Sequence, residues 1–320
     1  MNIRKPLIIV FKLASLLIAF VLVLAFVFLL GLNLFKFIYY NDYFSHLSKE
    51  SKNPGLSDNF VPQGITRCDN LFVTVGYMSD NTNSRIYTVD FETGEIKYFP
   101  LISDGRIFTG HTGGIQYLDG YFYLANEGTG LFKFTAAAIF QKSETKIEIG
   151  NPIKLNSNTS FVYGKDGYLY VGEFHKEVDY PCTNEITFDG KTHYAIVEKY
   201  HISDLTKPLT VYSIPGLVQG FCVKNDGTIV LSTSWGVNSS NFYIYESDKI
   251  VKTGTTYNDA ELFFLTEASK TIKAPAMSED LDIVKDTQNK EKVLTMFESA
   301  SNKYMFGKFF FANYVAALEI

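Results

Sequence analysis

Carboxylate and amide side chains recur at one point of a repeated sequence unit. The positions seven residues beyond the turn residues Asp119, Asp166, Asp226 and Glu291 are Asn126, Glu173, Thr233 and Glu298. Three of these four carry a carboxylate or an amide. Oxygen ligands of this kind suit Ca²⁺ better than zinc. We therefore expect a metal or ligand site where these positions converge.

The side-chain types suggest three roles. The side chains expected to hold a metal, with Ca²⁺ as the expected ion, are Glu173, Glu279, Asp280 and Glu298. His111 and His175 are the expected catalytic residues, because imidazole titrates near working pH and can act as a base or a charge stabiliser. The side chains expected to bind a ligand are Gln63, Tyr77, Asn126, Glu127, Gln219 and Trp235.

Trp235 is the only tryptophan, and it lies among small polar residues in the segment Ser232–Gly236. An aromatic ring beside hydroxyl groups suits a sugar, although packing between sheets is the competing interpretation. The chain has no HExxH, GxSxG, P-loop or CxxC motif, so no particular enzyme class is indicated.

A recurring sequence unit typical of β-hairpins indicates where these residues lie in the fold. The unit Asp-Gly-Tyr-x-Tyr occurs at Asp119–Tyr123 and Asp166–Tyr170, with a relative at Asp226–Val230. Asp-Gly favours a tight turn because glycine takes positive φ without strain. The strands before the turns open at Gln63, Gly113, Ser160, Gln219 and Glu279, at intervals of 50, 47, 59 and 60 residues. This repeat predicts an all-β propeller of five blades, with six as the alternative; a sandwich would not repeat its turns at a fixed interval.

Propeller geometry predicts that the site residues meet. The first strand of each blade lines the central channel, and the second strand runs antiparallel to it. The start of the first strand and the end of the second therefore lie on one face, at one mouth of the channel. The glycine-rich segment Gly110–Gly114 indicates a close approach of backbones or a sharp bend there.

The N-terminal residues form a different kind of segment. From Leu13 to Leu32 the chain is apolar apart from Ser15, which is long enough to span a ~30 Å hydrocarbon core. Three basic residues precede this stretch, which predicts a cytoplasmic N-terminus and a propeller outside the cell membrane. A cleaved signal peptide, giving a secreted protein, is the alternative, but no Ala-x-Ala pattern follows. We expect a cytoplasmic segment over 1–12, an anchor over 13–35, a stalk or lead-in over 36–59 and the propeller over 60–320.

Charge restricts the classes of expected partner, and cysteine content restricts the expected disulfide and thiol chemistry. Beyond residue 40 the chain carries 25 basic and 34 acidic residues, so nucleic acid is not an expected partner. The three cysteines are too few for a disulfide framework. Cys222 is expected as a buried thiol, a disulfide through Cys182 is the alternative for that residue, and no thiol enzyme is expected because no cysteine has a histidine at a suitable spacing.

Most of the chain past residue 53 resembles a known group. The segments Asn53–Leu56 with Phe60–Ile65, Gly76–Met78 with Ser84–Tyr87, and Gly110–Ile115 resemble a group of uncharacterised bacterial proteins that are membrane-anchored or secreted. More distantly, the repeat is similar to the gluconolactonase (SMP-30-like) and strictosidine-synthase-like propellers. That resemblance implies a divalent metal held in the channel by Glu, Asn and Asp side chains, mostly in six-bladed rings, and hydrolysis of a lactone or ester.

Two functions follow from the sequence. The first is an extracellular propeller that binds a small polar or carbohydrate-like ligand, or a protein partner, at the channel mouth. The second is a calcium-dependent hydrolase of a lactone, ester or glycan, in which the metal polarises the substrate carbonyl.

Overall fold

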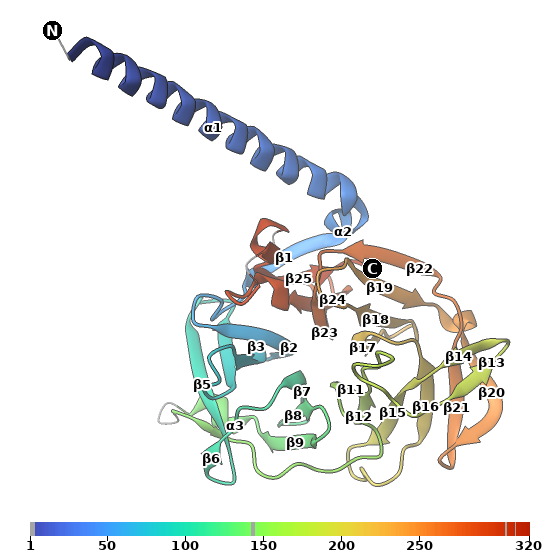
Figure 1. The fold of residues 1–320 in the computed structure, drawn as a ribbon. Coiled ribbons are helices and arrows are strands. Elements are labelled where there is room, and N and C mark those ends of the chain that lie inside the picture. The colour runs from blue at the N-terminus through green and yellow to red at the C-terminus, as the bar shows by residue number, and fades with distance from the viewer. Residues whose placement is uncertain (1–3, 142–144, 305, 311) are drawn as a thin grey trace.

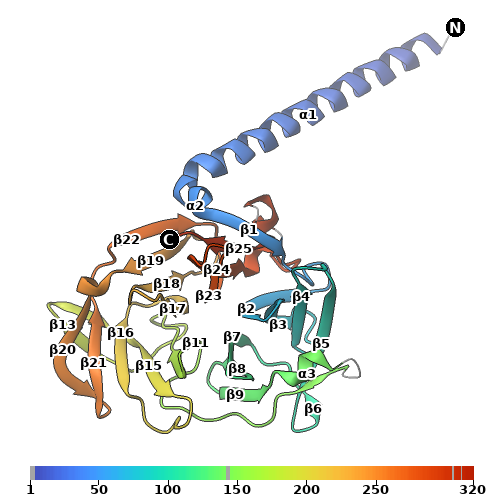
Figure 2. The same ribbon diagram turned by 180° about the vertical axis from the view of Figure 1, so that it is seen from behind.

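A computed structural model describes residues 4–141, 145–304, 306–310 and 312–320, which form a five-bladed propeller preceded by one long helix (Figures 1 and 2). The expected fold class and blade number are confirmed. The innermost strands of the five blades are β2 (Phe60–Cys68), β7 (Thr112–Leu118), β11 (Phe161–Lys165), β17 (Val218–Val223) and β23 (Ser278–Lys285).

The second strands are β3 (Leu71–Met78), β8 (Tyr121–Asn126), β12 (Tyr168–Gly172), β18 (Ile229–Thr233) and β24 (Glu291–Phe297). The third strands are β4 (Arg85–Asp90), β9 (Gly130–Thr135), β15 (Ala195–His201), β19 (Ser240–Tyr245) and β25 (Tyr314–Leu318). The outermost strands are β5 (Ile96–Ser103), β16 (Thr210–Ile214), β22 (Lys270–Ala274) and β1 (Leu47–Lys52), while blade two has only a bridge between Leu131 and Ile153 there.

Short elements decorate the blades. The strands β6 (Arg106–Ile107) and β10 (Ile147–Glu148) flank β5, and β13 (Ile186–Phe188) pairs with β14 (Lys191–His193) in a separate hairpin. The hairpin of β20 (Ile250–Tyr257) and β21 (Ala260–Leu265) interrupts blade four and pairs with β16 of blade three. The remaining short helices are α2 (Asn41–His46), α3 (Ala137–Phe140), η1 (Ser247–Lys249), η2 (Glu298–Ala300) and η3 (Phe306–Phe310).

The N-terminal strand closes the ring. The sequence leaves open whether residues 41–60 add a strand, and β1 pairs antiparallel with β25, Leu47 opposite Leu318. The segment expected as a stalk thus carries α2 and the outer strand of blade five. Because both ends of the propeller chain lie in one blade, the backbone hydrogen bonds of that sheet hold the ring shut.

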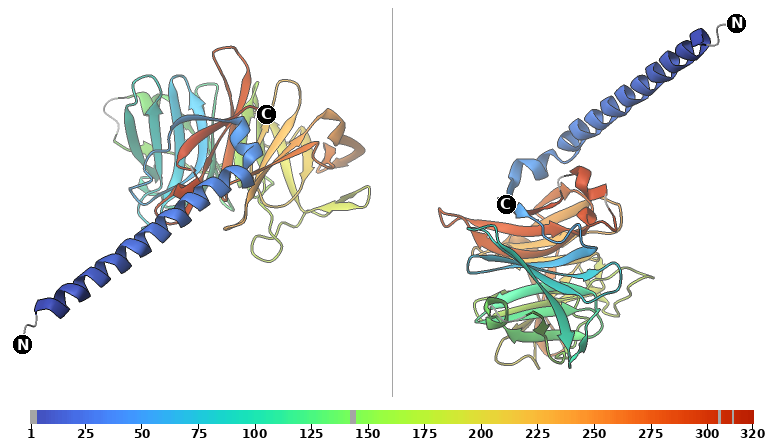
Figure 3. Two further views of the ribbon diagram at one scale, coloured as in Figure 1. Left: turned by 90° about the horizontal axis from the view of Figure 1, so that it is seen from above. Right: turned by 90° about the vertical axis from the view of Figure 1, so that its left-hand side faces the viewer.

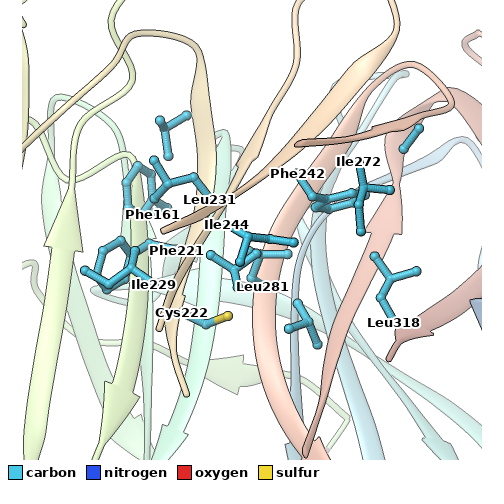
Figure 4. Packing of buried hydrophobic residues seen from close by; sticks show 14 of the residues in the cluster. Phe161, Phe221, Cys222, Ile229, Leu231, Phe242, Ile244, Ile272, Leu281 and Leu318 are labelled. Carbon is cyan, nitrogen blue, oxygen red and sulfur yellow. The ribbon is translucent and has the colours of Figure 1, made fainter. Parts of the chain in front are cut away.

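Apolar side chains fill the spaces between neighbouring sheets. Phe221, Leu231, Ile244 and Leu281 pack together between blades of the second half of the ring (Figure 4). Tyr170 stacks on Phe221 with ring centroids 5.4 Å apart, so the many aromatic residues serve to fill the wedges between twisted sheets. All three cysteines are free thiols, Cys68 and Cys222 buried and Cys182 half-buried.

The inner strands approach one another so closely that glycine is required. A Cβ on Gly64 would lie 2.7 Å from the backbone nitrogen of Ile115, and one on Gly220 would lie 2.7 Å from that of Leu281. A Cβ on Gly113 would collide with the carbonyl oxygen of Ser160. The close approach expected from the glycine-rich segment is therefore present.

The helix α1 (Arg4–Tyr39) is apolar, and the part that could cross a membrane, Ile9–Tyr39, is largely exposed, although Lys36 near its end is buried. It packs on the propeller only through its last residues, where the Lys36 ammonium donates to the Phe309 carbonyl at 2.7 Å. By length and composition, this helix fits a signal anchor or a signal sequence.

A buried carboxylate joins three blades at the centre. One Asp280 oxygen accepts the backbone N–H of Ile65 at 3.3 Å and of Ile115 at 3.1 Å, while the other accepts that of Leu281 at 3.0 Å. These donors belong to β2, β7 and β23, so a single side chain ties blades one, two and five together.

We predict that Asp280→Ala destabilises the fold by about 2–4 kcal/mol, because it leaves buried backbone donors without an acceptor. Thermal unfolding of the full chain in detergent measures this as a lower Tm. Asp280→Asn keeps a carbonyl oxygen at the same place and should lose less. A Tm of Asp280→Ala equal to that of the wild type would contradict the assigned role.

Candidate functional site

A cavity of about 680 Å³ opens at the mouth where first strands begin and second strands end. Its walls combine carboxylates, amides, hydroxyls and aromatic rings. The lining residues are Gln63, Tyr77, His111, Gly113, Asn126, Glu127, Ser160, Phe174, Tyr180, Gln219, Ser234, Trp235, Gly236, Met277, Glu279, Glu298, Lys303 and Tyr304. All six expected ligand-binding residues therefore line one cavity, with one of the two expected catalytic histidines and two of the four expected metal ligands.

Bulges in the inner strands direct the polar side chains into the cavity. In β2 the pairing passes from Pro62 to Gly64 and leaves Gln63 out, and in β17 it passes from Val218 to Gly220 and leaves out Gln219. The same shift leaves out Gly113 in β7, and both Glu279 and Asp280 in β23. A residue left out of the ladder is free to turn its side chain away from the normal alternation.

Glu279 is a buried carboxyl in the cavity lining. Its side chain is only 3% exposed, it lines the cavity, and among the described residues it has no hydrogen-bond partner. Burial, and then the charges of Glu298 and Asp280, raise the pKa of Glu279 well above its ordinary value. The raised pKa favours the protonated form of this carboxyl, which can both donate and accept hydrogen bonds.

Glu298 has partners where Glu279 has none. The Gln63 amide nitrogen donates to its carboxylate, and the Tyr304 hydroxyl hydrogen-bonds to it as well. Burial raises the pKa of Glu298 while these two hydrogen bonds and nearby Lys303 oppose the rise. The two glutamates thus form an unequal pair, with Glu298 better suited to carry the negative charge.

Lys303 joins a group of rings on one wall. Its ammonium donates to the Tyr77 hydroxyl at 2.6 Å and lies 5.0 Å from the centre of the Tyr304 ring. Tyr77 in turn packs on His111 with centroids 4.7 Å apart. Desolvation within the cavity wall and the charge of Lys303 lower the pKa of His111, so its imidazole is neutral at physiological pH.

Trp235 packs within an aromatic group at the rim. Phe174 stacks at 6.1 Å, Tyr180 meets the ring edge-on at 6.0 Å, and the Lys176 ammonium lies 4.4 Å from the ring centre. The tryptophan is half-buried. The ring packs between two blades and also lines the cavity. Its position is therefore compatible with both interpretations made from the sequence, packing between sheets and contact with a ligand.

Three expected site residues lie outside the cavity. The oxygens of Asp280 bind backbone N–H groups at the centre of the ring. Glu173 accepts the backbone N–H groups of Asn158 and Ile196 beside a second cavity of about 420 Å³. His175 accepts the N–H of Cys182 at 3.0 Å, which fastens a surface loop.

The four expected metal ligands are consequently not gathered in one place. Within the described ranges, no group of three or more His, Cys, Asp or Glu side chains is placed to hold a metal ion. The residues present do not form a metal-binding set of that kind, and calcium binding stays a prediction from the sequence.

Four cavity-lining residues were not predicted from the sequence: Lys303, Tyr304, Phe174 and Met277. Lys303 and Tyr304 belong to the long polar connection between β24 and β25, where neither strand period nor turn chemistry predicts a side-chain direction. Its length was the available signal, since long loops often carry binding residues. Tyr180 lies in the connection between β12 and β13.

Comparisons with known proteins give the fold alone. No protein-family model matches the sequence, and no curated protein matches it. Similar solved structures include the glutaminyl cyclase of Myxococcus xanthus (10% identity, TM-score 0.46, 86% of this chain and 94% of that one). Others are the PQQ-bound aldose sugar dehydrogenase of Streptomyces coelicolor (11%, 0.46, 79% and 77%) and the xylose-complexed GH43_1 enzyme of Xanthomonas citri (10%, 0.43, 77% and 84%). The fold assignment rests on the strand order of this chain.

The raised pKa of Glu173 should make the stability of the fold depend on pH. Burial raises its pKa to about 7, so between about pH 4.5 and 7 the folded state keeps a proton that the unfolded state has released. Its contribution to stability is thus fully present below pH 4.5 and is lost as the pH rises through 7, by roughly 3 kcal/mol.

Thermal melts of the full chain at pH 5 and pH 8 test this. Glu173→Gln should reduce the fall in Tm between the two pH values, whereas Glu177→Gln, an exposed carboxyl nearby, should leave it unchanged. An identical fall in wild type and Glu173→Gln would refute the assignment.

Proposed function

We propose that this protein is a membrane-anchored extracellular propeller that binds a small, polar, carbohydrate-like ligand in the cavity at its mouth. The anchor is α1, with its N-terminus in the cytoplasm and the propeller outside. Basic residues precede the apolar stretch and only Lys36 closely follows it, which supports this orientation.

The Glu279 carboxyl is the observation that carries the proposal. A buried polar group without a partner costs stability, and a packed core would be more stable with an apolar side chain there. Such a cost is characteristic of functional sites, where stability is given up for binding or catalysis. The free hydrogen-bonding capacity of Glu279 is directed into the cavity, where a ligand can satisfy it.

The surrounding groups support a hydroxyl-bearing ligand. A protonated carboxyl can donate to one hydroxyl and accept from another, and Glu127, Gln219 and Ser234 add further donors and acceptors to the lining of the same cavity. Trp235 and Tyr77 supply ring surface beside them. The cavity volume of about 680 Å³ is in the range of small-molecule sites, which favours a small ligand over a protein partner.

We expect Glu279→Gln to separate binding from stability. Because glutamine cannot ionise, the variant should melt at a higher temperature than the wild type at pH 8. It should also bind sugars at least about tenfold more weakly, since one hydrogen bond is worth about 1.5 kcal/mol.

The emission of the single tryptophan, titrated with a panel of methyl glycosides, reports binding. Glu185→Gln, an exposed carboxyl, is the matched control. If no glycoside altered the emission of the wild type, or if Glu279→Gln bound as the wild type does, the proposal would be wrong.

A hydrolase of a lactone, ester or glycan is the second candidate. The specific observation in its favour is the unequal pair of Glu279 and Glu298. A carboxyl whose pKa is raised can protonate a leaving group while its ionised neighbour stabilises charge, as paired carboxylates do in glycoside hydrolysis.

Calcium distinguishes the metal-dependent form of that hydrolase from the binding protein. An ion specific to the folded state would raise stability by about 2.7 kcal/mol at one hundred times its Kd. We expect equal Tm values for the full chain in EDTA and in excess Ca²⁺, because only two of the four expected ligands line the cavity. A rise in Tm that Glu279→Gln abolishes would instead establish a cavity metal and favour the hydrolase.

A further inference from the structure

We propose that the cavity mouth rests against the headgroup layer of the membrane that holds α1, and that its ligand is the sugar head of a membrane lipid. The proposal rests on the function proposed above and adds the source of the ligand. It is carried by where the anchor joins the propeller and by what surrounds the mouth.

The anchor joins the propeller on the mouth side. The Lys36 ammonium bonds to the Phe309 carbonyl in η3, at the end of the connection that carries Lys303 and Tyr304. The Tyr40 hydroxyl lies 3.1 Å from that of Ser239, in the loop that also carries Trp235. Both loops that receive the helix end are thus cavity-lining loops.

The next segment leads away from the mouth. The helix α2 ends at the opposite face, where the His46 carbonyl accepts the N–H of Glu319 at 3.0 Å and its ring lies 3.2 Å from the Lys270 ammonium. Strand β1 then returns toward the mouth, ending with Lys52 opposite Tyr314. The end of α1 is therefore fixed at the face that carries the mouth, and not at the opposite face, where the Asp-Gly turns lie.

Exposed apolar side chains surround the mouth beside the anchor. Val178 is 88% exposed, Val237 76% and Phe309 58%, and they come from loops of blades three, four and five. Contacts connect these loops: Tyr180 packs on Trp235, and Phe310 packs on Tyr40 with centroids 5.9 Å apart. Single exposed apolar residues occur on any protein, but these three lie on successive loops that lead from α1 across the rim.

The direction of α1 agrees with this placement. In the left panel of Figure 3, α1 and the yellow-green segment that includes β13 and β14 extend to the same side of the propeller. That segment follows the loop that contributes Phe174 and Tyr180 to the cavity. A membrane crossed by α1 would thus lie on the side to which the mouth opens.

The charges near the anchor complement a lipid surface. Lys303 and Lys308 are exposed on the connection that receives α1, where ammonium groups can meet lipid phosphates. The carboxyls lie deeper, at Glu279 and Glu298. A glycolipid fits this order, with its phosphate or glycerol region at the rim and its sugar hydroxyls at the carboxyls.

The single tryptophan makes the orientation measurable. The full chain is placed in phosphatidylcholine nanodiscs whose acyl chains are either plain or brominated, because bromine quenches indole emission only at short range. We expect brominated lipid to reduce the emission of Trp235. The matched control is Trp235→Phe with Tyr121→Trp, which moves the indole beside the Asp119-Gly120 turn on the opposite face, and its emission should not change.

Equal emission of Trp235 in plain and brominated discs would overturn the orientation, as would equal quenching of both variants. The ligand source is tested by adding glucosyl-diacylglycerol to plain discs, which should change the emission of Trp235 in the wild type and not in Glu279→Gln. If soluble methyl glucoside gave that change and the glycolipid did not, the cavity would bind free sugars and the lipid source would be wrong. Quenching without any response to either sugar would keep the orientation and contradict the sugar ligand.

Discussion

The structure depends on a carboxylate that reaches across the axis of the ring. Asp280 accepts backbone N–H groups from the inner strands of blades one, two and five, and Asp282 does the same one pair further along, where it accepts the Thr66 hydroxyl and the Arg67 N–H. Buried backbone N–H groups of the inner strands that lack a ladder partner need another acceptor, and the two aspartates supply it. The glycines of the inner strands permit the approach, and the aspartates make it stable.

The cavity is a consequence of the same crowding. The inner strands are crowded at the centre, and the cavity of about 680 Å³ opens at the mouth, where these strands carry their bulges. The bulges in β2 and β17 each leave one residue out of the ladder and the shift in β23 leaves out two; of these residues, Gln63, Gln219 and Glu279 line the cavity. In β23 the bulge leaves two neighbouring residues, Glu279 and Asp280, out of the ladder, and their side chains have different surroundings. Asp280 accepts hydrogen bonds from the backbone of the ring, while Glu279 lines the cavity.

The repeat was predictable from the sequence because three of the five blades carry an Asp-Gly turn between two β-prone runs, and the strands before the turns recur at similar intervals in all five. The starts of the first strands and the ends of the second strands placed Gln63, Tyr77, Asn126 and Gln219 at one mouth, and all four line one cavity. The same counting could not separate Glu279 from Asp280 or direct Glu173, because a bulge, or its absence in β11, reverses which face a side chain takes. Lys303 and Tyr304 lie in a loop whose direction depends on contacts with the rest of the fold.

The order of elements along the chain connects the anchor to the site. A propeller that closes with its N-terminal strand must bring whatever precedes that strand to the last blade. Here the preceding element is α1, and the last blade carries both Glu279 and Glu298. The closure could have left the anchor on either face, but the length of α2 carries the chain across the edge of the blade, so that α1 joins at the mouth. The mode of ring closure thus places the apolar helix α1 on the same blade as the buried carboxyl pair.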